Sequence, residues 1–255
     1  MSENKDLSKE YWSNESVNFT KICMAEYGSP LGDAIRDFMA GLLPEGPTNV
    51  SERRLNVLDV GCGTGFLTML LCQLGCKVTA IDFAQGMIDL AEENCRNEGF
   101  DDVTFFNMDA QDLKFEDNTF DFAVVRNVVW MVPDAEKVYR EMYRVLKTGG
   151  VLLNLDGDYG RGIRELENSD DINELTPEGQ NEIHIRSEIA SQLPVSFEDR
   201  PIWDVKVLWG CGAGEVRVIK DIEDYLDIAK YNKSSMHEQA IRARSQIFAV
   251  IAVKS

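Results

Sequence analysis

The chain has 255 residues, 44% of them hydrophobic, and its 44 Asp and Glu against 26 Lys and Arg give a formal net charge of −18. This composition is enough to bury a sizeable core, and the acidic excess argues against non-specific binding to nucleic acid or to anionic membranes. No apolar run approaches a membrane span, the polar N-terminus shows no secretory signal, and six cysteines without a CxxC pair beside only two histidines predict no metal site and free thiols in the cytoplasm.

The first part of the chain differs in pattern from the remainder. Residues 1–30 are polar with scattered aromatic side chains, and Leu31–Leu43 has the apolar spacing of an amphipathic helix. The Pro-Glu-Gly-Pro sequence at 44–47 ends that helix. We therefore expect residues 1–54 to form an N-terminal helical lid.

From Leu55 onward, short apolar strands alternate with helical segments. The predicted strands are Asn56–Val60, Lys77–Ile81, Val103–Phe106, Phe122–Val125 and Val151–Leu155, and the predicted helices between them are Phe66–Leu74, Ala84–Gly99 and Pro133–Leu146. Strands joined by helical crossovers imply an α/β fold with a parallel sheet covered on both faces, so residues 55–155 form its core.

The alternation breaks after the fifth strand. Residues 156–200 are polar, with helix candidates at Ile163–Asn168 and Pro177–Gln192, and we interpret them as an insertion that caps the acceptor. Residues 201–255 then complete the sheet, with predicted helices at Trp203–Gly210 and Asp221–Ala243 and predicted strands at Val216–Ile219 and Gln246–Val253. The whole of 1–255 is thus expected to be a single domain.

The most informative motif is the glycine-rich turn after the first strand. Glycines 61, 63 and 65 are spaced G-x-G-x-G, whereas dinucleotide binders need a further glycine where this chain has Phe66. Asp82 ends the second strand and can accept hydrogen bonds from ribose hydroxyls, and Asp109 follows the third strand, where a carboxylate meets an exocyclic adenine amine. No Arg or Lys cluster is available for phosphates. The pattern favours an adenosine with a cationic tail over a nucleotide.

These motifs carry a family resemblance. Residues 55–155 resemble class I S-adenosylmethionine-dependent methyltransferases, of the small-molecule type that includes the ubiquinone/menaquinone-biosynthesis C-methyltransferases. The matching segments are VLDVGCGTG (57–65), AIDFAQGMIDLA (80–91), FFNMDAQDLKFEDNTFDFAVVRN (105–127) and YREMYRVLKTGGVLL (139–153). Thr148 stands where the family usually has proline. The resemblance implies a Rossmann-like, seven-stranded, mostly parallel doubly wound sheet with N-terminal helices and an insertion after strand five forming a lid.

The resemblance also implies roles for single residues in binding S-adenosyl-L-methionine. The loop of Gly61, Cys62 and Gly63 would contact the methionine moiety, and Asp59 would orient its amino group. The other implied contacts are Asp82 to the ribose, Phe83 and Met87 beside the adenine, Asp109 and Ala110 at the adenine edge, the Arg126 carbonyl to the amino group, and Trp12 and Phe19 as an N-terminal cover.

Methyl transfer needs mainly a well-placed acceptor, because the sulfonium is already activated. Acceptor-site candidates lie at the ends of strands four and five: Arg126, Asn127, Trp130, Asp156, Asp158 and Tyr159. Asp158 is the first choice for an acceptor-orienting carboxylate or general base, and the alternative is that it caps a turn. Arg126 alternatively forms a salt bridge with the insertion, and Trp130 either packs in the core or walls the acceptor pocket.

The predicted function is therefore methyl transfer to a small-molecule acceptor, with no nucleic acid or membrane partner. Three alternatives stay open at this point. The chain methylates a protein or basic peptide, it binds S-adenosylmethionine without catalysis, or it is a nicotinamide-dependent oxidoreductase. Phe66 in the glycine motif opposes the last of these. The sequence identifies neither the acceptor nor the oligomeric state.

Overall fold

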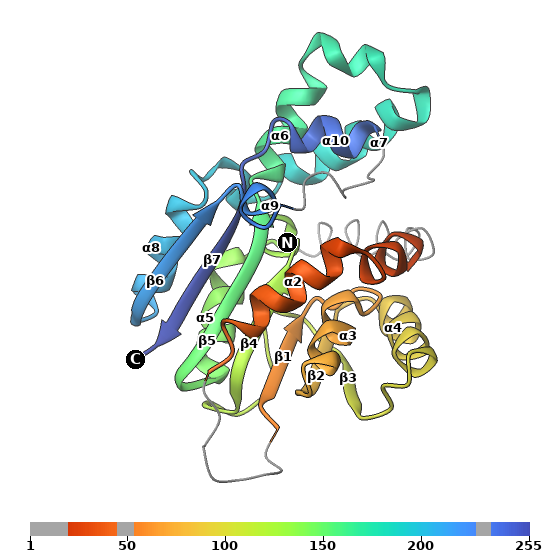
Figure 1. Ribbon diagram of the computed structural model, residues 1–255. Coiled ribbons are helices and arrows are strands. Elements are labelled where there is room, and N and C mark those ends of the chain that lie inside the picture. Colours follow the sequence, from red (N-terminus) through yellow and green to blue (C-terminus); the bar gives the residue numbers. More distant parts are fainter. Residues whose placement is uncertain (1–19, 45–53, 228–235) are drawn as a thin grey trace.

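The computed structural model describes residues 20–44, 54–227 and 236–255, so Trp12 and Phe19 lie outside the described residues. Within them, seven strands form one sheet in the order β3-β2-β1-β4-β5-β7-β6 (Figure 1). The strands are β1 (Asn56–Val60), β2 (Lys77–Asp82), β3 (Val103–Asn107), β4 (Phe120–Arg126), β5 (Leu146–Gly157), β6 (Ala213–Lys220) and β7 (Ile247–Lys254).

The sheet is parallel from β3 to β5, and β7 runs antiparallel to both of its neighbours. This confirms the predicted seven-stranded, mostly parallel doubly wound sheet. The apolar character of β1 and β4 follows from their central position, because a strand covered on both faces exposes neither set of side chains. The strand order reverses between β1 and β4, and ligands of open α/β sheets bind beyond the carboxyl ends of the strands at such a point.

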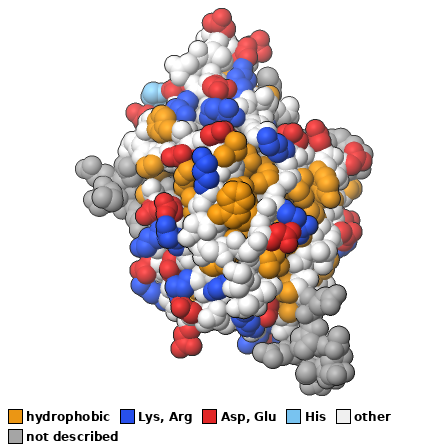
Figure 2. Space-filling model, turned by 90° about the vertical axis from the view of Figure 1, so that its left-hand side faces the viewer, with side chains coloured by type: hydrophobic (Ala, Val, Ile, Leu, Met, Phe, Trp, Pro, Cys, Tyr) orange, Lys and Arg blue, Asp and Glu red, His pale blue; other side chains and the backbone are white. Residues whose placement is uncertain are grey.

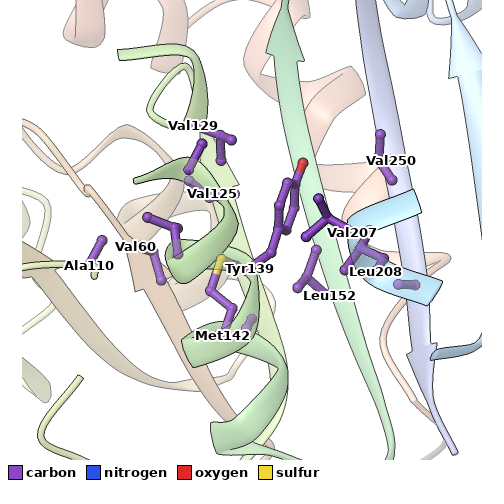
Figure 3. Close-up of a cluster of buried hydrophobic side chains, with 14 of the residues drawn as sticks. Val60, Ala110, Val125, Val129, Tyr139, Met142, Leu152, Val207, Leu208 and Val250 are labelled. Carbon is purple, nitrogen blue, oxygen red and sulfur yellow. The ribbon is translucent and has the colours of Figure 1, made fainter. Parts of the chain in front are cut away.

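Helices cover both faces of the sheet. Apolar side chains of α2 (Pro30–Ala40), α3 (Phe66–Gln73), α4 (Gln85–Asn97) and α9 (Ile222–Tyr225) pack on one face, and those of α5 (Ala135–Val145) and α8 (Ile202–Gly210) pack on the other. Figure 3 shows the second of these cores, where the ring of Tyr139 on α5 lies beside Leu152 of β5 and Val207 of α8. Helices packed on both faces make the sheet rigid, and the sheet fixes the positions of the loops at its strand ends.

The segment after β5 forms a small group of helices, and its role as a lid over an acceptor stays a prediction. It contains α6 (Tyr159–Glu167), α7 (Pro177–Ser191) and the short 3-10 helices η2 (Asp170–Glu174) and η3 (Pro194–Phe197). Its core also includes Trp130, from the 3-10 helix η1 (Val129–Met131), and Ile241, from α10 (Met236–Arg242). Figure 1 shows α6, α7 and α10 grouped beyond the carboxyl ends of the strands. Residues 236–242 thus pack with the insertion, although α8, β6 and α9 lie between the two in the sequence.

Several element boundaries differ from the sequence prediction. Asp221–Ala243 is not one helix, because α9 ends at Tyr225 and Asp227 has a left-handed backbone with φ 54. Short acidic side chains tolerate that conformation better than most residues do. Helix α5 begins at Ala135 rather than at Pro133, because the Asp134 carboxylate accepts a hydrogen bond from the Lys137 amide at 3.0 Å and caps the helix. Residues 20–27 are helical as well.

The surface around α8 carries exposed apolar side chains, including Ile202 and Trp209. Figure 2 shows this face, with apolar side chains gathered at its middle and charged side chains of both signs around them. The acidic excess of the chain is therefore not concentrated into a single patch on this face. Among the described helices, none has the length and apolar character that crossing a membrane requires.

Candidate active site

The loop after β1 is shaped by glycines. Gly61, Gly63 and Gly65 all have positive φ, at 67°, 53° and 99°. A Cβ on Gly61 would lie 2.4 Å from Val128 Cγ2, so this backbone passes directly against the loop that follows β4. The Cys62 amide donates to the Ile81 carbonyl at 2.9 Å, which ties the same loop to β2. Only a residue without a Cβ fits at position 61, and the loop is held at the switch point between β1 and β4.

Asp82 joins the first two loops of the site. Its Oδ2 accepts the Gly63 amide at 3.0 Å and its Oδ1 accepts the Ala84 amide at 2.9 Å. Burial raises the pKa of Asp82 to about 6, while the backbone amides favour its ionised form. A carboxylate has about four lone-pair sites. The backbone amides of Gly63, Phe83 and Ala84 use three of these sites, so the carboxylate keeps capacity to accept a further hydrogen bond from a ribose hydroxyl.

Asp59 faces helix α3. The Thr68 hydroxyl donates to Asp59 Oδ2 at 2.6 Å, and the carboxylate is 1% exposed. Burial raises the pKa of Asp59 to about 7. This contact anchors α3 to β1 beneath the glycine loop. The role predicted for Asp59 in orienting a ligand amino group stays a prediction.

The adenine-side candidates lie at the ends of β2 and β3. Asp109 Oδ1 accepts both the backbone amide and the side-chain amide of Gln111, each at 2.9 Å. The Met108 amide donates to the Asp82 carbonyl at 2.9 Å and brings the two strand ends together. Three further candidates lie around these ends: Ala110 and Met87, which are buried, and Phe83, which is half-buried.

Arg126 ends β4 and has a different partner from the one expected. Its Nη1 donates to Glu26 Oε2 at 2.9 Å, and its Cζ lies 4.5 Å from the centre of the Phe66 ring. Arg126 therefore forms its salt bridge with the N-terminal helical segment. The alternative that Arg126 pairs with the insertion is wrong. The pair spans a hundred residues of sequence. No sequence pattern around Glu26 predicts this salt bridge.

Four acceptor-site candidates line one half-open pocket beyond β4 and β5: Arg126, Asn127, Asp156 and Tyr159. Trp130 does not line this pocket and is a packing residue. Its ring lies edge-on to the Tyr159 ring at 5.6 Å between ring centres, and its Nε1 donates to the Asn127 carbonyl at 3.1 Å. Asp158 directly precedes α6 and does not line this pocket, and Arg161 Nε approaches its Oδ2 to 2.7 Å. Its Oδ1 is buried without a partner among the described residues. The use of Asp158 as a base stays a prediction.

A buried network of charged side chains lies next to this pocket and includes one of its lining residues, Asp156. Arg200, which no sequence motif marks, contacts Asp156 Oδ2 at 3.0 Å and Asp204 Oδ1 at 2.7 Å. The Tyr139 hydroxyl donates to Asp204 Oδ1 at 2.6 Å. Asp156 also accepts the amides of Trp130 and Gly157, at 3.1 and 2.9 Å. Burial raises the pKa of Asp156 to about 6, and the Arg200 guanidinium opposes that rise. The network fixes the end of β5 against η1 and α8.

The comparisons with known proteins bear on the same region. Residues 58–154 match the family model described as a methyltransferase domain. The chain is 36% identical over 108 residues to the demethylmenaquinone methyltransferase of Listeria welshimeri, a match that covers 41% of this chain and 46% of the relative. It is 40% identical over 123 residues to a phosphatidylethanolamine N-methyltransferase of Cereibacter sphaeroides, covering 46% of this chain and 60% of the relative.

Those matches span about half the length of the curated relatives. Among solved structures, phosphoethanolamine N-methyltransferase 2 of Haemonchus contortus in complex with S-adenosyl-L-methionine superposes with a TM-score of 0.62. That superposition covers 92% of this chain and 57% of the other at 18% identity, and it supports the fold.

Proposed function

Because residues 58–154 match a family model described as a methyltransferase domain, we propose that this chain is a class I methyltransferase that transfers a methyl group from S-adenosyl-L-methionine to a small-molecule acceptor. The observation that carries the proposal is the position of Asp82. Its carboxylate binds the Gly63 amide of the glycine loop and the Ala84 amide at the start of α4, and so stands between two loops at the carboxyl edge of the sheet. A carboxylate acceptor in this position suits the hydroxyls of a ribose diol next to a tail lying along the glycine loop.

The residues around Asp82 fit the remaining parts of the cofactor. The glycine loop at 61–65 is proposed to lie along the methionine moiety, and the Arg126 carbonyl at the end of β4 is proposed to meet its amino group. Phe83 and Met87 are proposed to flank the adenine, and Asp109 with Ala110 to bind its edge. Clustered Lys or Arg side chains, which a pyrophosphate would need, are absent from the loops at 61–65, 82–84 and 108–110.

When bound, S-adenosylmethionine supplies a methyl group already activated by its sulfonium. The protein then has to hold the acceptor atom close to that group and in line with it, and such placement supplies a large part of the rate. Asp156, Tyr159 and Asn127 are among the polar side chains that line the pocket beyond β4 and β5, where we propose that the acceptor binds. A base is needed only for an acceptor that is protonated at neutral pH, and Asp158 stays the candidate for that step.

A small-molecule acceptor is favoured over a peptide because both curated relatives carry non-peptide acceptors in their names. All six cysteines are free thiols, and on that ground we propose a reducing cytoplasmic location. Turnover of any acceptor in the presence of S-adenosylmethionine would separate an enzyme from a non-catalytic cofactor-binding protein.

The test is calorimetric titration with S-adenosylhomocysteine beside NADH. We expect binding of the former alone, and we expect Asp82→Ala to weaken it by about 1.5–3 kcal/mol, the scale of hydrogen bonds to a charged group. Asp82→Asn keeps an acceptor oxygen for the Gly63 amide and guards against a folding defect. Asp89→Ala, on the exposed side of α4, is the matched control. Binding of NADH, or unchanged affinity in both Asp82 variants, would refute the proposal.

A further inference from the structure

The residue that follows β4 has an unusual backbone conformation. Asn127 has φ 57, in the left-handed region that few residues other than glycine adopt. Asparagine tolerates this region better than most residues do, and β-branched residues tolerate it least. Such residues persist where the surrounding structure fixes them, and they cluster at functional sites. Asn127 lies at such a place, because it follows β4 at the switch point between β1 and β4.

The amide, the carbonyl and the side chain of Asn127 each have a hydrogen-bond partner. Its amide donates to the Leu155 carbonyl of β5 at 2.9 Å. Its carbonyl accepts from Trp130 Nε1 at 3.1 Å, and its Oδ1 accepts from the Tyr159 hydroxyl at 3.3 Å. Both of these aromatic side chains are buried. The contacts therefore fix the peptide groups on both sides of Asn127.

The peptide group between Arg126 and Asn127 determines where the Arg126 carbonyl points. This peptide is trans, because the one cis peptide bond among the described residues precedes Pro201. In a planar trans peptide the N–H and the C=O point in opposite directions. Strand β4 lies between β1 and β5 (Figure 1), and the Asn127 N–H points to β5. The Arg126 carbonyl therefore points to the side of β4 on which β1 lies.

Strand β1 has already ended at this level of the sheet. Its last residue, Val60, is in register with Val125, and the glycine loop follows directly. The Cys62 amide of that loop donates to a carbonyl of β2 and is thus turned away from β4. The Arg126 carbonyl consequently faces the glycine loop at the carboxyl edge of the sheet, where it can accept a hydrogen bond from a ligand.

We propose that Asn127 is a positioning residue of the cofactor site. Its left-handed backbone holds the Arg126 carbonyl toward the primary amino group of the methionine moiety, and the site thereby selects ligands that carry this group. The role belongs to the backbone of Asn127, because its side chain is already bound by Tyr159. The inference rests on the proposed function, since the amino group is that of the proposed cofactor.

The experiment uses S-adenosylhomocysteine and its deamino analogue, in which a hydrogen atom replaces the amino group. Their affinities for the full chain are measured by calorimetry. We expect wild type to bind S-adenosylhomocysteine at least ~10-fold more tightly, the scale of a hydrogen bond to a charged group. Asn127→Val disfavours the left-handed backbone and should reduce this preference at least ~5-fold. Asn127→Gly permits that backbone without the side chain and should keep the preference within ~3-fold of wild type.

Asn118→Val is the matched control. Asn118 has the same φ of 57, is exposed, and precedes β4 at the opposite end of the strand. Valine there carries the same kind of backbone penalty and should leave the preference unchanged. None of these substitutions changes the net charge, so the charge difference between the two ligands affects every variant equally. Thermal melting confirms that each variant is folded, and Asn127→Ala, with a smaller backbone penalty, replaces Asn127→Val if the latter does not fold.

The outcomes separate the inference from the proposed function. A wild-type preference below ~3-fold, a preference retained in the folded Asn127→Val or Asn127→Ala variant, or a preference lost in Asn127→Gly or Asn118→Val would each overturn the role of Asn127. If S-adenosylhomocysteine does not bind wild type, methyl transfer is refuted and the inference with it. If it binds without this selectivity, the inference alone is refuted and the proposed function stands.

Discussion

Replacing Gly61 by alanine tests how closely the glycine loop packs against the loop that follows β4. Gly61 has φ 67, where an L-residue costs about 1–2 kcal/mol. Its new Cβ would lie 2.4 Å from Val128 Cγ2, and overpacking of a rigid site adds about 1–3 kcal/mol. We expect Gly61→Ala to lower the free energy of unfolding by about 2–5 kcal/mol in total, measured by urea denaturation.

Gly75→Ala isolates the backbone part of this effect. Gly75 has φ 74, and a Cβ there meets nothing within 4 Å, so only the left-handed backbone is unfavourable. Adding Val128→Ala to Gly61→Ala should recover most of the difference between the two single variants, because it removes the methyl group that the Cβ meets. If Gly61→Ala is no more destabilising than Gly75→Ala, or if Val128→Ala brings no recovery, the inferred close approach is wrong.

Two further predictions concern buried charges. Burial raises the pKa of Asp59 from 3.8 to about 7, so the folded chain holds this proton more tightly than the unfolded chain does. Its contribution to stability is present below pH 3.8 and is lost as the pH rises through about 7. The stability difference between wild type and Asp59→Asn should therefore change by up to ~1.4 kcal/mol per pH unit in urea denaturations across that window, and a constant difference would contradict the raised pKa. Arg200→Ala leaves Asp156 and Asp204 buried without their guanidinium, and we expect a loss of about 3–5 kcal/mol by the same assay. A loss of under ~1 kcal/mol would show that the network is not closed as described.

The parts of the fold that depend on local pattern were predictable from the sequence. Apolar runs that end in an aspartate or a glycine turn gave the order of strands and helices from β1 to β5. Asp82 and Asp109 were found because parallel strands bring their carboxyl ends to one edge of the sheet. Arg200 and Asp204 were not found, because a charge in a polar stretch has the same appearance whether it ends up solvated or buried.

The amino-acid sequence by itself determined the α/β class, the seven strands, the glycine loop and the carboxylates at the strand ends. Each of these depends on periodicity or on residue types a few positions apart. Only the tertiary structure decided that Arg126 pairs with Glu26, that residues 236–242 pack with α6 and α7, and that Arg242 shares a pocket with Tyr159. The physical reason is that such contacts join residues tens of positions or more apart, and chain folding alone brings them together.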